Sequence, residues 1–223
     1  HIRMNLGYMK HPVNLVALGS GVSMGFLGNS HFGLEDLAIM RTIPNMNISA
    51  PADCVELGKI LEDYIINERG PSYIRLSGVP GYKKVYDKDY NYNFGRPITL
   101  SQGKDILILT YGSMVSQCLG ASKLLKKKNI SVELLNIHTI KPINKIIIKS
   151  LKKYKKIVTV EEHTIIGGLG SIVSEILTTN SLKSKLLKIA LPDKFGPTGN
   201  YNYLLDFHGL VEKKITKKIL NFL

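Results

Sequence analysis

The sequence of 223 residues lacks tryptophan, contains two cysteines and has no long apolar run. A membrane-spanning helix needs about 20 consecutive apolar residues, and the chain shows neither such a run nor the pattern of a signal peptide. Cys54 and Cys118 lie far apart and form no C-x-x-C pair, which excludes a metal site built by cysteines alone. These absences predict a soluble, cytoplasmic protein without a membrane partner, in which both thiols are buried and reduced.

Acidic residues are also scarce, since 17 Asp and Glu stand against 30 Lys and Arg and leave a net charge of +13. Eleven lysines and a single acid, Glu133, lie between Ser122 and Lys156. Clustered cations can bind nucleic acid by releasing counterions from phosphates, but no RNA-binding aromatic motif, zinc finger or long basic tail accompanies them. The lysines surround predicted helices, where a solvated helix face explains them, so we expect no nucleic-acid partner.

Apolar runs and helical patterns alternate along residues 1–78. Short apolar runs that end in glycine or serine are typical of buried parallel strands, and apolar residues three and four apart predict helices. Ser30 is expected to cap one helix, with Glu35 and Asp36 near its positive end. Strands are expected at 13–21, 46–50 and 71–78, and helices at 32–41 and from Pro51 to about residue 69, which makes a β-α-β-α-β unit.

Residues 79–104 are rich in glycine, proline and tyrosine and have little periodicity, so we expect a linker between two domains. The alternation resumes beyond it, and the sequence therefore predicts an α/β protein with two doubly wound, mostly parallel sheets joined by this linker. In the second domain, 105–223, strands are expected at 105–112, 130–136, 156–162 and 186–191, helices at 115–128, 143–153 and 171–178, and a last helix around Val211, Ile215 and Ile219.

Residues 19–31, GSGVSMGFLGNSH, follow a predicted strand, and in open α/β sheets ligands bind beyond the carboxyl ends of strands. The glycines allow close backbone approach, while Ser20, Ser23 and Ser30 can donate hydrogen bonds. The imidazole of His31 is a side chain of the kind that exchanges protons in catalysis. An equally simple interpretation is that Ser30 caps the next helix and that His31 is a polar turn residue.

Residues 161–171, EEHTIIGGLGS, are a second candidate site, with Glu161, Glu162 and His163 at a strand end and glycines that lead into a helix. The start of that helix could hold an anion, although the full G-x-G-x-x-G dinucleotide pattern is missing. Tight packing at a strand–helix junction also explains the glycines. The sequence shows no Ser-His-Asp triad, Walker loop or metal-ligand spacing.

Five motifs occur in a distinctive order: GNSHFGLEDLAIMRTIPNMNISAPAD, GPSYIRLSG, TIKPIN, VTVEEHTIIGGLGS and ALPDKFGPTG. In order and spacing they resemble the C-terminal half of transketolases, in particular the small subunits of enzymes whose catalytic unit is split over two chains. The resemblance covers essentially the whole sequence. It implies that residues 1–78 are the later part of a pyrimidine-binding domain, that 79–104 are a linker, and that 105–223 are the transketolase C-terminal domain.

Members of that family use thiamine diphosphate with a divalent metal, usually magnesium, and transfer a two-carbon ketol unit from a ketose to an aldehyde. The resemblance implies that cofactor and metal are held mainly outside this chain, by a diphosphate-binding partner subunit or domain, in a homodimer or a heterotetramer. It matches His31 to the family histidine that contacts the sugar donor, and we expect Ser20 and Ser30 to bind substrate. Glu161, Glu162 and His163 would then organise a turn or an interface.

Three positions depart from the family pattern. Leu27 replaces an aspartate, Gly19 replaces a histidine, and Gly78 replaces an arginine that binds the acceptor phosphate. These changes remove groups that recognise sugar hydroxyls and phosphate, and they argue against a phosphosugar synthase such as deoxyxylulose-phosphate synthase. Arg75 is the nearby candidate to bind substrate instead, although strand alternation puts it on the face opposite to residue 78.

The family's glutamate that activates the cofactor, and the aromatic residues that stack on its pyrimidine, precede the region that this chain resembles. We therefore expect this chain alone to be inactive. Two alternatives stay open. The first is a beta chain of a 2-oxoacid dehydrogenase, for which the sequence shows no signal for docking onto an acyltransferase core, and the second is a non-catalytic assembly module that keeps the fold to bind a partner.

Overall fold

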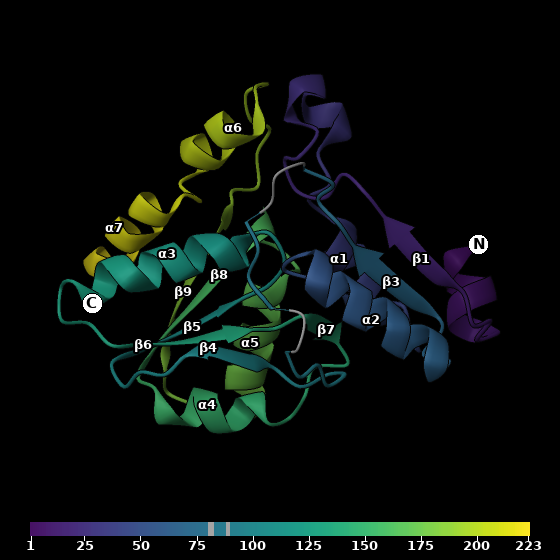
Figure 1. The fold of residues 1–223 in the computed structure, drawn as a ribbon, viewed down its shortest axis with the longest axis horizontal. Helices are drawn as coiled ribbons and strands as arrows, with labels where there is room; N and C mark the ends of the chain where they lie inside the picture. Colours follow the sequence, from purple (N-terminus) through teal and green to yellow (C-terminus); the bar gives the residue numbers. More distant parts are fainter. Residues whose placement is uncertain (80–82, 88–89) are drawn as a thin grey trace.

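Two β-sheets lie side by side, and helices cover each of them, in the computed structural model, which describes residues 1–79, 83–87 and 90–223 (Figure 1). Most neighbouring strands run parallel, as alternating apolar runs and helical segments predict. The expected α/β fold with two mostly parallel sheets is therefore confirmed.

The first sheet has the strand order β1-β3-β2-β7. Its parallel strands are β1 (Asn14–Ala17), β3 (Ser72–Arg75) and β2 (Asn47–Ser49). The strand β7 (Thr139–Lys141), which the sequence pattern did not predict, pairs antiparallel with β2. Because β7 comes from beyond residue 105, the two halves of the chain share this sheet. The helical segments of the first half are η1 (Ile2–Tyr8), η2 (Gly25–Leu27), η3 (Asn29–His31), α1 (Asp36–Arg41) and α2 (Cys54–Ile66).

The second sheet has the order β4-β6-β5-β8-β9, in which β4 is antiparallel to β6 and the others are parallel. The strand β4 (Ile98–Ser101) lies inside the segment 79–104, so the expectation of a linker over that whole range was wrong. Its pairing with β6 is reinforced by the Ser101 hydroxyl, which donates to the Val132 carbonyl at 2.9 Å. The remaining strands are β5 (Ile106–Thr110), β6 (Val132–Asn136), β8 (Lys156–Thr164) and β9 (Lys185–Leu191).

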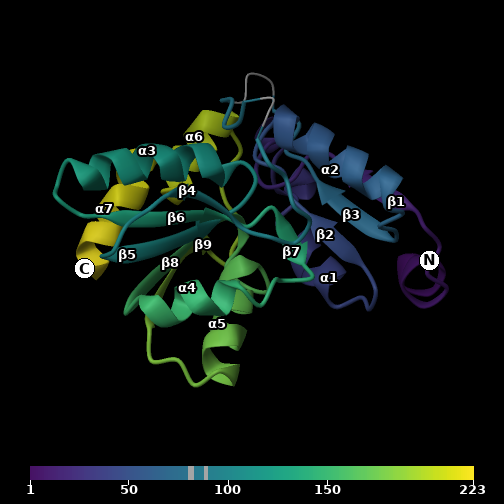
Figure 2. The same cartoon turned by 60° about the horizontal axis from the view of Figure 1, so that its bottom comes forward.

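Helices pack on both faces of the second sheet (Figure 2). They are α3 (Met114–Lys126), α4 (Ile147–Lys153), α5 (Leu169–Thr179), α6 (Tyr201–His208) and α7 (Glu212–Phe222). Successive residues of a strand point to opposite faces, and β5 shows the result. Leu107 and Leu109 pack into the core beneath α4 and α5, whereas Ile106 and Ile108 pack against α3 and α7.

One hydrophobic core joins the two halves of the chain. Leu37 and Met40 from α1 and Ile48 from β2 belong to the same buried cluster as Leu107 and Leu109 of β5. Burial of apolar surface is the main favourable contribution to folding. The first sheet therefore depends for its stability on the second half of the chain.

One helix begins later than the sequence pattern indicated, and one was not predicted. The helix expected at 32–41 begins only at Asp36, because Phe32 is extended and the backbone of Gly33 exchanges hydrogen bonds with Gly21. Ser30 therefore caps no helix, contrary to that interpretation. Near the C-terminus, the helix expected around Val211, Ile215 and Ile219 is α7, and it is preceded by α6, which the sequence pattern did not predict and which ends at Gly209 with φ +72°.

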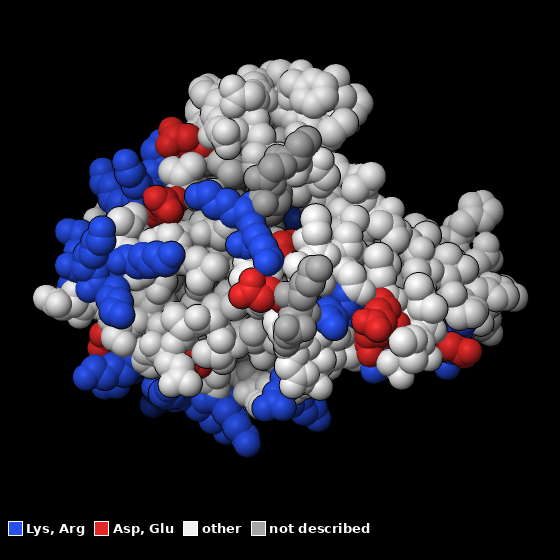
Figure 3. Space-filling model, in the orientation of Figure 1, with Lys and Arg blue, Asp and Glu red and all other residues white. Residues whose placement is uncertain are grey.

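The lysine-rich segment is a solvated surface, as predicted. Of its eleven lysines, all except Lys141 and Lys156 are exposed, and Figure 3 shows basic side chains gathered over α7 and the end of α3. In the part of the chain that the structure describes, no helix has both the length and the apolar character to cross a membrane.

Gly103 and Gly58 differ in whether the surrounding structure has room for an added methyl group. A Cβ at Gly103 would lie 2.2 Å from the Val132 carbonyl carbon and 2.5 Å from the Glu133 nitrogen, whereas a Cβ at Gly58 in α2 meets nothing within 4 Å. We expect Gly103→Ala to lower the free energy of unfolding by about 1–3 kcal/mol, because backbone atoms have to move. The control Gly58→Ala should raise it by up to about 1 kcal/mol. Urea unfolding of both variants measures the difference, and equal effects would contradict the packing described.

Candidate functional site

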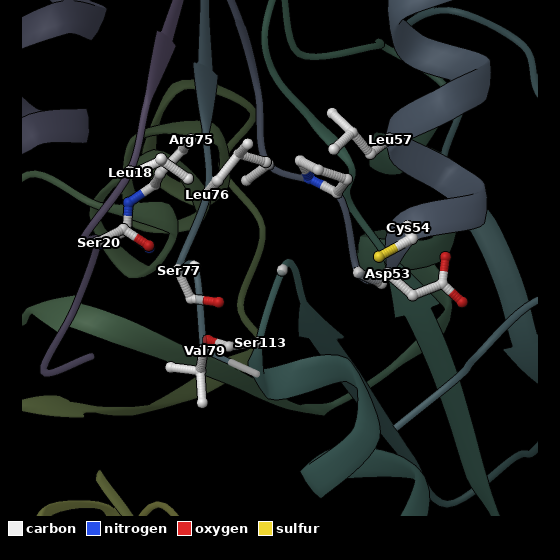
Figure 4. A pocket seen from close by; sticks show the side chains of 15 residues that line it. Leu18, Ser20, Asp53, Cys54, Leu57, Arg75, Leu76, Ser77, Val79 and Ser113 are labelled. Atoms are coloured by element: carbon white, nitrogen blue, oxygen red, sulfur yellow. The ribbon is translucent and has the colours of Figure 1, made fainter. Parts of the chain in front are cut away.

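A cavity of about 240 Å³ opens where the first sheet ends, beside the start of α2 and the start of α3. Figure 4 shows the strand-end residues on one side, including Leu18 and Ser77, and Cys54 at the start of α2 on the other. This position follows the rule that ligands bind at the carboxyl ends of the strands of open α/β sheets. The cavity is therefore the candidate binding site of the first sheet.

Two of the four predicted site residues line this cavity. Ser20 is 8% exposed, and its backbone N–H donates to the Leu76 carbonyl at 3.1 Å. Arg75 is the second. Cys54, which we expected to be buried, is exposed at the cavity, because it is the first residue of α2 and its side chain is not drawn into a core. Cys118 is buried as expected.

Ser30 and His31 lie outside the set of residues that line the cavity. Both belong to η3 and are exposed, and Ser30 Oγ lies 3.0 Å from His31 Nδ1. The backbone still links them to the cavity, since Gly33 pairs with Ser20 and Gly21. The structure thus places His31 on an exposed turn outside the cavity, two residues before Gly33.

Arg75 is almost completely buried and binds neighbouring segments of the protein. Its Nε donates to Asp36 Oδ2 at 2.8 Å, and its Nη2 donates to the carbonyls of Gly33 and Glu162, both at 3.0 Å. Burial has the largest single effect and lowers the pKa of Arg75, but the Asp36 carboxylate together with Tyr111 and Glu162 outweighs it, so the pKa is raised. The guanidinium is therefore a charged, fixed part of the cavity wall.

Glu162 connects the site loop to the second sheet. Its Oε1 accepts from the Val22 N–H at 2.8 Å, and its Oε2 accepts from the hydroxyls of Ser113 at 2.5 Å and Tyr201 at 2.8 Å. Burial raises the pKa of Glu162 above its ordinary value, although these donors oppose the change. Both oxygens of the Glu162 carboxyl group therefore accept hydrogen bonds from other parts of the protein.

Glu161 and His163 hold the turn that follows β8. Glu161 accepts from the N–H groups of Leu169 and Gly170 at 2.7 and 2.8 Å, so it occupies the positive start of α5 where an anion could otherwise bind. Burial, and then the nearby Arg75, lower the pKa of His163 to about 4. The neutral ring fits its contacts, with Nδ1 donating to the Thr164 carbonyl at 2.8 Å. The prediction that these residues organise a turn or an interface is confirmed for Glu161 and His163 as regards the turn.

A buried glutamate that the sequence pattern did not reveal lies behind the cavity. Glu56 is fully buried, and it accepts from the Ala52 N–H at 2.6 Å, from Asn136 Nδ2 at 2.9 Å and from the Tyr90 hydroxyl at 3.1 Å. Burial raises its pKa to about 7. The available signal was the spacing of Asp53 and Glu56, which is typical of a helix start, and Asp53 does cap α2 through the Glu56 N–H.

Neither the cavity nor any other described part of the chain offers a metal centre. Among residues 1–79, 83–87 and 90–223, no three His, Cys, Asp or Glu side chains are grouped so that they could hold a metal ion. A magnesium ion that also binds a phosphate group is typically coordinated by carboxylate or amide oxygens of the protein. The described residues of the candidate site therefore comprise a cavity and, on a separate turn, an exposed histidine.

Family models match both halves of the chain. The model of the transketolase pyrimidine-binding domain matches residues 1–78, and that of the transketolase C-terminal domain matches residues 95–215. The chain is 38% identical over 221 residues to a protein of Methanocaldococcus jannaschii named “Putative transketolase C-terminal section”. The matched region is 98% of this chain and 69% of that protein.

Two further relatives are named as parts of divided enzymes. A protein of Phocaeicola vulgatus named as a subunit of apulose-4-phosphate transketolase is 32% identical over 223 residues, which are 99% of this chain and 70% of that protein. A solved structure described as a split gene transketolase, inactive beta4 tetramer, superposes with a TM-score of 0.84 at 34% identity, covering 99% of this chain and 69% of that one.

The buried Glu56 predicts a specific pH dependence of stability. The pKa of Glu56 is 4.5 when free and about 7 in the folded protein, so between these values the folded state keeps a proton that the unfolded state releases. The stabilising effect is complete below about pH 4.5 and is lost as the pH rises toward 7. At about 1.4 kcal/mol per pKa unit, the loss is about 3 kcal/mol.

The variant Glu56→Gln cannot titrate and isolates this effect from the other groups. Urea unfolding of both proteins between pH 4.5 and 7.5 should show the wild type losing stability relative to Glu56→Gln as the pH rises. A difference between the two proteins that stays constant with pH would contradict the burial of Glu56.

Proposed function

The chain belongs to the transketolase family, and from this membership we propose that it is the C-terminal part of an enzyme that transfers a two-carbon ketol unit from a ketose to an aldehyde. Within it we assign residues 1–78 to the pyrimidine-binding domain and 105–223 to the C-terminal domain. The enzyme is proposed to act with a diphosphate-binding partner chain or domain, in a homodimer or a heterotetramer of such pairs. The relatives named as a transketolase subunit and as a split transketolase support this division.

The exposed imidazole of His31, two residues before the Gly33 that pairs with the cavity residue Ser20, is the observation that carries the proposal. In the transfer, the bond between carbons 2 and 3 of the donor breaks, and a new bond forms to the carbonyl carbon of the acceptor. The donor's 3-hydroxyl loses its proton as its oxygen becomes a carbonyl, and the acceptor's carbonyl oxygen gains one. A histidine that takes up the first proton and returns the second ends the cycle unchanged.

Ser30 and Ser20 would support this proton transfer in different ways. The contact between Ser30 Oγ and His31 Nδ1 at 3.0 Å occupies one ring nitrogen and leaves Nε2 to meet a sugar hydroxyl. Ser20 lines the cavity and would orient the substrate through its hydroxyl. Arg75 contributes a fixed positive charge to the same wall.

Thiamine diphosphate would supply the electron sink that carbon–carbon bond cleavage requires. The described residues do not fit its diphosphate end, because they offer no group of metal ligands. We therefore assign the diphosphate and a magnesium ion to the partner, and to this chain the cavity at the edge of the first sheet.

The cavity also bears on the choice of substrate. Gly78, with φ +72°, lies against Leu18 at the position where phosphosugar transketolases have an arginine. The guanidinium of Arg75 is directed to Asp36, Gly33 and Glu162. We therefore propose that this chain provides no arginine clamp for an acceptor phosphate, and that its substrates are held mainly through hydroxyl groups.

The variant His31→Ala tests the proposed chemistry in the complete enzyme with its partner, thiamine diphosphate and magnesium. With the ketose L-erythrulose as donor, whose 3-hydroxyl must lose its proton, and D-glyceraldehyde as acceptor, kcat should fall about 100-fold, the usual contribution of a general acid–base group. The chain alone should show no turnover.

The control variant is His11→Ala, which removes an exposed histidine at the amino end of β1, away from the cavity. It should leave kcat unchanged, and both variants should unfold at the wild-type temperature. If His31→Ala retains the wild-type kcat at saturating donor and acceptor, His31 has no part in the reaction.

A further inference from the structure

A segment near the C-terminus packs directly on the turn that carries His31. The Gly199 N–H donates to the Gly25 carbonyl at 3.1 Å, and Figure 1 shows α6 beside the N-terminal segment that contains this turn. A Cβ at Gly25 would lie 2.1 Å from Leu204 Cδ1 and 2.7 Å from the Gly199 oxygen. The two segments therefore touch so closely that only a glycine fits between them.

The side chain of Asn29 forms a two-point hydrogen bond across this contact. Its Nδ2 donates to the Gly196 carbonyl at 2.8 Å, and the Gly196 N–H donates back to its Oδ1 at 3.0 Å. A primary amide that meets one backbone unit with both its donor and its acceptor is fixed in position and in orientation. Asn29 begins η3 and precedes His31 by two residues.

The other end of the same loop is held by Glu162. Its carboxylate accepts the Val22 N–H at 2.8 Å and also the Tyr201 hydroxyl at 2.8 Å, next to the start of α6. Gly21, with φ +68°, passes so near that a Cβ there would lie 2.1 Å from Glu162 Oε1. The loop is thus anchored by the second half of the chain at both ends, at Val22 and at Asn29.

We propose that Asn29 is a positioning residue, which sets the place of the His31 ring through its pairing with Gly196. This inference rests on the proposed role of His31. The His31 ring is exposed, and its hydrogen-bond contact is with its neighbour Ser30, so the backbone of η3 decides where the ring lies. A displacement of about 1 Å can cost about 100-fold in rate.

The segment 192–204 therefore acts on the reaction without contacting the substrate. Residues close to the C-terminus thus hold in place the turn that carries the His31 imidazole. A substrate-binding role for Asn29 would change KM, whereas a positioning role changes kcat and acts only while His31 is present.

The test compares Asn29→Ala with His31→Ala and with the double variant, in the complete enzyme with L-erythrulose as donor and D-glyceraldehyde as acceptor. Asn29→Ala should lower kcat about tenfold and leave KM within twofold. In the His31→Ala background it should have no further effect, because a residue that acts through another is not additive with it. Asn29→Asp, which cannot donate to the Gly196 carbonyl, should resemble Asn29→Ala.

Asn180→Ala is the matched control, because its amide caps the end of α5 with a hydrogen bond of 2.9 Å to Ile176 and lies away from the loop. It should change neither kcat nor hydrogen exchange in the loop. In Asn29→Ala, amide exchange at residues 25–33 should become faster while the global free energy of unfolding stays within about 1 kcal/mol of the wild type.

The outcomes separate the two proposals. If His31→Ala lowers kcat and Asn29→Ala does not, or if the two losses add in the double variant, the positioning role of Asn29 is wrong. If His31→Ala itself has no effect, the proposed role of His31 fails. Hydrogen exchange then decides on the pairing alone: faster exchange at 25–33 supports it, and unchanged exchange overturns it.

Discussion

The buried guanidinium of Arg75 joins three parts of the chain that are far apart in sequence. It donates to Asp36 at the start of α1, to the Gly33 carbonyl behind the His31 turn, and to the Glu162 carbonyl in β8. Removing one partner of such a buried pair typically costs about 3–5 kcal/mol, because the remaining charge is stranded. The relative position of the two sheets, and with it the shape of the cavity between the strand ends and α2, depends on this junction.

The same junction shows how the second half of the chain holds the candidate site residues of the first half in place. Ser20 and Arg75 line the cavity, and Glu162 fixes the loop between Ser20 and the His31 turn from the opposite sheet. The residues Glu161, Glu162 and His163 therefore support the candidate site structurally and do not line it. The two carboxylates accept hydrogen bonds from backbone N–H groups and hydroxyls, and the neutral histidine donates to a backbone carbonyl. These side chains therefore hold structural hydrogen bonds and are not available to exchange protons with a substrate.

Local patterns in the sequence predicted the buried strands β5, β6 and β8 and the long helices, because an apolar run or a helical stripe reports burial directly. They also predicted the strand β1, but not its exposure, since β1 lies at the edge of its sheet and Val16 is 50% exposed. They failed for β4 and β7, whose few residues become strands by pairing with distant partners. For the site, His31 was identified through a family resemblance. The Asn29–Gly196 pairing spans 167 positions and the Glu56–Asn136 contact spans 80, and no local spacing encodes contacts of that range.

In the proposed enzyme, this chain forms one side of a cofactor site whose other side, with the metal, belongs to a diphosphate-binding partner. Native mass spectrometry of the full-length protein, purified gently from its own cells, tests this division most directly. We expect a complex that contains a second chain and retains thiamine diphosphate. An assembly of this chain alone, which takes up no added thiamine diphosphate with magnesium, would contradict the division and favour a non-catalytic assembly module.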